Sequence, residues 1–184
     1  MENKKQLYYS IKLGIFAVLA ILIFIFRETL IDNLKYFIGG LMLLYGIEEI
    51  AFEIIFTKKQ FLHQSKVYLG TVELILGVVL LAAPFSFEAV CVIWGTWSII
   101  RESYEIKEVV TEMEFLAPRL ISGIESLVVI AFSIELIIKQ DHHGAMTHMY
   151  LLLVELICTP LVPLLEEILL ERKQKNNEQN QQDC

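Results

Sequence analysis

Basic residues and cysteines are scarce in this chain of 184 residues. It has 15 Lys and Arg against 22 Asp and Glu, which gives a formal net charge of −7. Nucleic-acid surfaces and polybasic lipid-binding surfaces need clustered Lys and Arg, so this balance argues against both. The three cysteines, Cys91, Cys158 and Cys184, lack metal-ligand spacing, and we expect them to be unpaired.

The short motifs of catalysis are absent from the sequence as well. There is no phosphate-binding glycine loop, no paired metal motif and no assignable Ser-His-Asp pattern. We therefore expect no enzymatic activity, no cofactor and no bound metal.

Apolar residues are what the chain has in abundance: 55% of it is hydrophobic, and the mean hydropathy is +0.57. A bilayer core about 30 Å thick needs roughly 20 apolar residues per helix, so six spans take about 120 residues. The sequence holds six such segments, separated by polar breaks, at roughly 11–26, 36–56, 67–84, 86–106, 118–138 and 145–170. These segments are too long for barrel strands, so we predict an all-α polytopic membrane protein with six transmembrane helices.

The basic residues alternate between the two sides of this topology. Twelve Lys and Arg fall on one side, and three, Arg27, Lys35 and Lys139, fall on the other. By the positive-inside rule, the first side is cytoplasmic, and both termini lie there. We read the first segment as a retained signal anchor.

An internal repeat divides the six segments into three helical hairpins. Glu73 and Glu125 are 52 positions apart, as are the sequences around Glu53 and Glu105. The predicted hairpins cover about 1–58, 59–111 and 112–172 of a single domain, and a polar segment at 173–184 is expected to be a disordered cytoplasmic tail. Small residues are expected to allow close helix approach at Gly39, Gly40, Gly46, Gly70, Gly77, Gly95, Ser122 and Gly123.

Two glycine-punctuated segments carry a resemblance to a known family. The stretch from Phe37 to Ile47 and the stretch from Leu76 to Pro84 resemble the hairpins of the HdeD-like acid-resistance membrane proteins. The resemblance implies a bacterial inner-membrane protein with six helices in three hairpins, associated with survival of acid stress. Two departures are evident, since this chain has more intramembrane glutamates and its third repeat replaces glycines with Pro160 and Pro163.

Carboxylates inside the predicted spans are the most informative feature. A charge at the bilayer centre costs roughly 2.5–3.5 kcal/mol, so such groups face the protein interior or water. Many carboxylates in one low-dielectric cavity cannot all be ionised, and we expect some to hold protons. We predict an acidic vestibule, open to the cytoplasm, that binds protons or cations through Glu49, Glu53, Glu73, Arg101, Glu105, Glu125 and Glu166. The alternative is that the acids near helix ends, such as Glu102, Glu105 and Glu166, reach headgroup water.

Three of the four histidines, His142, His143 and His148, fall in or near the predicted external loop. Because histidine titrates between about pH 5 and 8, they are candidates for pH sensing. A transition-metal site and a solvated loop with incidental histidines are the two alternatives.

Together these features predict a non-enzymatic protein of acid or envelope stress in the bacterial inner membrane. The alternatives are a small transporter or channel for a cation or organic amine, and a membrane assembly factor. The expected partners are the lipid bilayer and a proton or cation, with a second copy of the chain as an open alternative and no nucleic acid.

Overall fold

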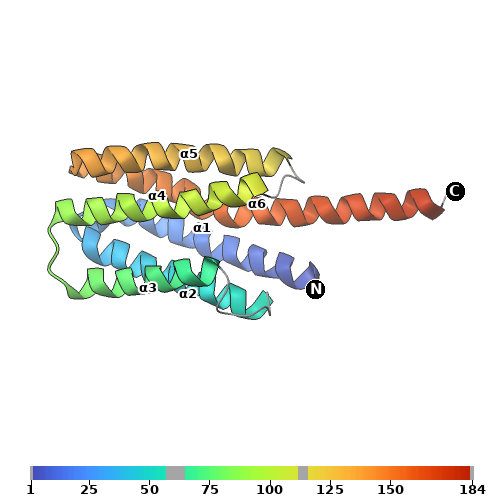
Figure 1. The fold of residues 1–184 in the computed structure, drawn as a ribbon, viewed down its shortest axis with the longest axis horizontal. Coiled ribbons are helices and arrows are strands. Elements are labelled where there is room, and N and C mark those ends of the chain that lie inside the picture. Colours follow the sequence, from blue (N-terminus) through green and yellow to red (C-terminus); the bar gives the residue numbers. More distant parts are fainter. Residues whose placement is uncertain (1, 57–64, 112–115, 183–184) are drawn as a thin grey trace. The chain divides into compact units, whose positions relative to one another are not determined.

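The computed structural model describes residues 2–56, 65–111 and 116–182, and leaves some side chains within these ranges undescribed. Six α-helices follow one another: α1 Glu2–Asp32, α2 Leu34–Phe56, α3 Ser65–Ala82, α4 Phe87–Thr111, α5 Leu116–Lys139 and α6 His142–Gln182 (Figure 1). The described ranges contain no strand. The prediction of an all-α protein is confirmed.

Each predicted apolar segment lies mainly or wholly in one helix, but several helices run further than the segments. Helix α1 begins at Glu2, and α6 continues to Gln182, through most of the segment for which we expected disorder. Lys, Gln and Glu are good helix formers, so a helix can extend past its apolar run into polar sequence. Apolar runs therefore mark the candidate span and not the helix end.

Polar groups define where two of the helices begin. The Ser86 hydroxyl accepts a hydrogen bond from the Ala89 amide at 3.3 Å, at the start of α4. The Asp141 carboxylate accepts one from the Gly144 amide at 2.6 Å, at the start of α6. Both side chains satisfy amides that the first turn of a helix leaves without an intrahelical partner. Gln140, just before this turn, has a φ of 50°.

The chain forms two compact units. Unit 1 comprises Met1–Ile25, Glu102–Val128 and Tyr150–Cys184, and unit 2 comprises Phe26–Arg101 and Val129–Met149. The division into three repeated hairpins stays a prediction.

Helices α2 and α3 of unit 2 approach closely at two pairs of glycines. A Cβ on Gly46 would lie 2.6 Å from the Gly70 carbonyl oxygen, and a Cβ on Gly77 would lie 2.9 Å from that of Gly39. Any side chain at Gly46 would meet backbone that cannot move without separating the helices. Gly40, by contrast, has nothing within 4 Å.

A third close approach joins α4 to α5. A Cβ on Gly95 would lie 2.8 Å from the Ser133 carbonyl oxygen. Gly123 makes only an ordinary contact, 3.5 Å from Val109. The expectation of close packing thus holds at Gly39, Gly46, Gly70, Gly77 and Gly95, and fails at Gly40.

Two stretches among the described residues are long and apolar enough to cross a membrane: Gln6–Asp32 and Leu120–Lys139. Only 17% and 22% of their most apolar windows are buried, whereas the core helix of a soluble protein is mostly buried. A shorter apolar helix covers Val67–Ala82. Length and composition therefore support membrane association.

Candidate functional site: a buried acid–arginine cluster

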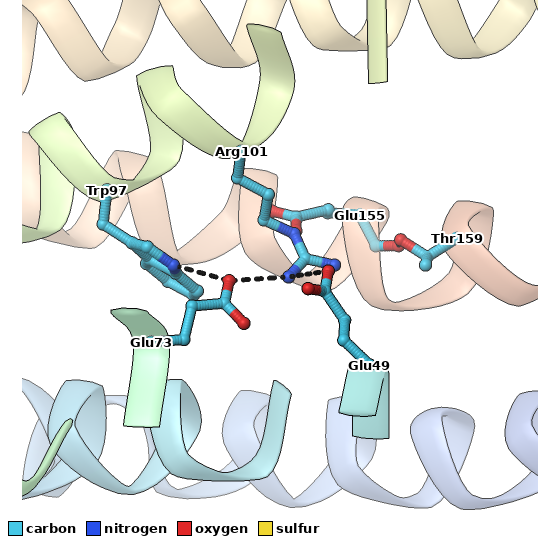
Figure 2. A network of polar contacts seen from close by, with 6 residues as sticks. All are labelled: Glu49, Glu73, Trp97, Arg101, Glu155 and Thr159. Atoms are coloured by element: carbon cyan, nitrogen blue, oxygen red, sulfur yellow. Dashed lines mark hydrogen bonds and ion pairs between the residues drawn. The ribbon is translucent and has the colours of Figure 1, made fainter. Parts of the chain in front are cut away.

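Three helices of unit 2 bring two carboxylates to one guanidinium. Nη1 of Arg101 on α4 lies 3.3 Å from Oε1 of Glu73 on α3 and 3.8 Å from Oε1 of Glu49 on α2 (Figure 2). The Glu73 side chain is 0% exposed, that of Arg101 5% and that of Glu49 13%. We call these three residues, with Tyr45 and Trp97, the acid–arginine cluster.

Aromatic rings cover the guanidinium. Its central carbon lies 3.7 Å from the centre of the Tyr45 ring and 6.0 Å from that of Trp97. The faces of both rings attract cations, more strongly where water is excluded. Tyr45 and Trp97 are themselves buried, with ring centres 5.8 Å apart. The rings therefore replace part of the hydration that Arg101 has lost.

The two oxygens of Glu73 have different surroundings. Its Oε1 accepts a hydrogen bond from the indole Nε1 of Trp97 at 2.8 Å and one from Nη1 of Arg101 at 3.3 Å (Figure 2). Its Oε2 is buried and has no hydrogen-bond partner among the described residues. A buried carboxylate oxygen without a donor is costly when the group is charged.

Helical spacing and the glycine contact explain why these side chains meet. Tyr45 and Glu49 are four residues apart on α2, as are Trp97 and Arg101 on α4, so each pair shares a helix face. The α2–α3 approach also brings Glu49 to the crossing, because its Cβ lies 3.3 Å from the Cβ position of Gly70. The glycines thus let two acids from neighbouring helices reach the same cation.

A second buried polar contact in unit 2 involves His148. Its Nε2 lies 3.1 Å from the Ser98 hydroxyl, and its ring centre lies 4.7 Å from that of Trp94 in an edge-to-face arrangement. The side chain is 3% exposed, and Nδ1 has no hydrogen-bond partner in the described part of the chain.

The three candidate pH-sensing histidines therefore do not form one group. His142 and His143 are exposed in the first turn of α6, where His142 stacks on Phe87 with ring centres 6.4 Å apart. His148 lies further along the same helix and is buried, so it does not share the exposed setting of the other two. The reason is the helical period, which turns His148 toward Trp94 and Ser98.

The remaining predicted acids belong to unit 1 or lie outside the description. Glu105, Glu125 and Glu166 are half-buried residues of unit 1, and the side chain of Glu53 lies outside the described residues. Glu102 and Glu155 of unit 1 are buried, so Glu102 does not reach headgroup water as the alternative supposed. A single vestibule shared by all these acids stays a prediction.

The described residues show no metal-binding group. They contain no group of three or more His, Cys, Asp or Glu side chains placed to hold a metal ion. Cys91 and Cys158 are free thiols.

Two residues of the cluster were missed by sequence reasoning. Neither Trp97 nor Tyr45 was among the predicted site residues. A usable signal was present, because the 52-position offset that relates Glu73 to Glu125 also relates Glu49 to Arg101. In the predicted repeat, an acid and a base thus occupy equivalent positions, which marks both as candidates for an interior ion pair.

The chain was compared with protein families, curated proteins and solved structures. No protein-family model, no curated protein and no solved structure matches the chain.

Proposed function

We propose that this protein is a non-enzymatic integral membrane protein whose acid–arginine cluster takes up a proton when the surroundings turn acidic. The observation that carries the proposal is the composition of the cluster. Two carboxylates, Glu49 and Glu73, share one guanidinium where Glu73 is fully buried.

The charge balance explains why a proton would bind there. With both acids ionised, the two carboxylates carry one more negative charge than Arg101 neutralises. Burial in a low-dielectric interior makes such an excess costly, and a protonated carboxyl removes it. Two acids that share one partner therefore act as a coupled pair with one readily protonated state.

The proposal includes a topology of six membrane spans in three hairpins, with both termini in the cytoplasm. It is supported by the two apolar stretches at Gln6–Asp32 and Leu120–Lys139 and by the twelve-to-three distribution of basic residues. A reporter that is active only in the cytoplasm tests it. The reporter should be active when fused after Cys184 and silent when inserted after Asp141, and the reverse pattern would overturn the topology.

The proposed setting is acid stress at a bacterial inner membrane. It is supported by the resemblance of the glycine-punctuated hairpins to HdeD-like proteins and by the glycine contacts at Gly46 and Gly70. A cluster that changes charge on acidification suits such a role, because its response depends on the proton concentration itself.

Survival of cells at low pH tests this function. Deletion of the gene should lower survival, the wild-type gene should restore it, and a gene carrying E49Q and E73Q should not. The matched control is E28Q, because Glu28 is an exposed acid on α1 with 68% of its side chain accessible. Equal survival of the deletion strain, or full rescue by the double variant, would overturn the proposed function.

A further inference from the structure

The acid–arginine cluster has two carboxyl groups, Glu49 and Glu73, and either could hold the proton. We propose that Glu73 is the proton-binding residue, that its Oε2 is the atom that takes the proton, and that Trp97 positions it. This assignment rests on the proposed function and goes one step beyond it, to a single atom.

The two acids differ in their access to water. Glu73 is 0% exposed and Glu49 13%. Loss of hydration penalises the ionised form, so the penalty falls more heavily on Glu73. Glu49 is the less buried of the two acids and is the better place for a persistent negative charge.

The two oxygens of Glu73 have different roles in proton binding. Oε1 already accepts from the Trp97 indole at 2.8 Å and from Arg101 at 3.3 Å. Oε2 has no donor among the described residues, so it is the open position for a hydrogen. In the protonated acid, Oε1 is the carbonyl oxygen and still accepts the indole N–H, whereas Oε2 carries the proton. Trp97 can therefore hold the carboxyl in one orientation in both states.

The charges around Glu73 stay balanced when it is protonated. Among the described residues of unit 2, Arg101 on α4 and Glu48 on α2 act electrostatically on Glu73. Glu49 approaches the same Nη1 of Arg101 at 3.8 Å. When Glu73 gains a proton and becomes neutral, Arg101 keeps Glu49 as its ionised partner. Uptake of one proton thus leaves no buried guanidinium without a carboxylate, which is the condition for a stable protonated state.

Infrared spectroscopy of the purified full-length protein in lipid nanodiscs tests the assignment, because a protonated carboxyl has its own carbonyl-stretch band. E73Q should abolish the band of the buried acid. E49Q should keep the band and move its appearance to lower pH, because the variant lacks one of the negative charges that disfavour the ionised form of Glu73. The opposite result, loss of the band in E49Q and its retention in E73Q, would overturn the assignment to Glu73.

Trp97 provides a second and independent variant. A hydrogen bond to an ionised carboxylate is stronger than one to its neutral form, so W97F should bind the proton about tenfold more tightly and keep the band to higher pH. The matched control is W94F, since Trp94 is equally buried on α4 but contacts His148. If the band appeared at the same pH in W97F as in the wild type, the positioning role of Trp97 would be overturned, even if E73Q does not fold.

These outcomes separate the two proposals. Absence of any buried-acid band in the wild-type protein down to the pH of unfolding would end the proposed function itself. A band that follows Glu49 would leave the proposed function standing and remove Glu73 from it.

Discussion

The indole nitrogen of Trp97 lies 2.8 Å from Oε1 of Glu73 and donates a hydrogen bond from α4 to α3. Both side chains are buried, with exposures of 3% and 0%. A buried carboxylate without such donors would bear the full cost of lost hydration. This contact therefore ties the stability of unit 2 to the protonation state of Glu73.

A double-mutant cycle measures this link. W97F and E73Q should each lower the free energy of unfolding by about 1–3 kcal/mol, because each leaves a buried polar partner less well satisfied. The double variant should cost clearly less than the sum of the two, since both changes remove one interaction. Unfolding in a fixed lipid–detergent mixture provides the measurement, and simple additivity would argue against the contact.

Arg101 should contribute more than either acid. Replacing it with Met leaves two carboxylates without their guanidinium, and removal of one partner from a buried ion pair costs about 3–5 kcal/mol. Adding E73Q to R101M should recover a substantial part of this loss, because one uncompensated charge disappears. If the second change deepened the loss of stability, the ion-pair account of the cluster would be wrong.

The helices were predictable from sequence, whereas the faces that pack were not. Long apolar runs marked all six helices, because a helix satisfies its backbone polar groups within the segment. Such helices are apolar on most sides, so periodicity does not reveal which face turns inward. The inward side of Tyr45 and Trp97 was missed for this reason, as was the burial of His148.

Single polar residues within apolar helices were the better guide to the site. Glu73 was expected in the interior because its charge is costly in lipid, and it is fully buried. Arg101 was predicted to lie among the acids of the vestibule, and it is within ion-pair distance of Glu49 and Glu73. The identity of these partners depends on the register of α2 against α3, which is set by the contact of Gly46 with Gly70.

The glycine contact between α2 and α3 gives a stability prediction with its own control. G46A should destabilise the protein by about 1–3 kcal/mol, because its Cβ would lie 2.6 Å from the Gly70 carbonyl oxygen. G40A, on the same helix with nothing within 4 Å, should be neutral or slightly stabilising. Thermal unfolding of the two variants side by side makes the comparison, and equal effects would contradict the close approach.

The histidines should differ in their reaction with a water-soluble acylating reagent. His142 and His143 are exposed and should be modified rapidly, whereas His148 is 3% exposed and should react only after unfolding. Mass spectrometry of the digested protein resolves these sites. Rapid modification of His148 in the folded protein would show that its contact with Ser98 does not persist.

Proton uptake by the purified protein tests the central claim most directly. A weakly buffered sample in nanodiscs is acidified in small steps, and an indicator dye counts the protons bound by the wild type and by the E49Q/E73Q variant. We expect the wild type to bind an additional proton per chain at mild acidity, before the exposed carboxylates titrate. Identical uptake by the two folded proteins would show that Glu49 and Glu73 hold no such proton.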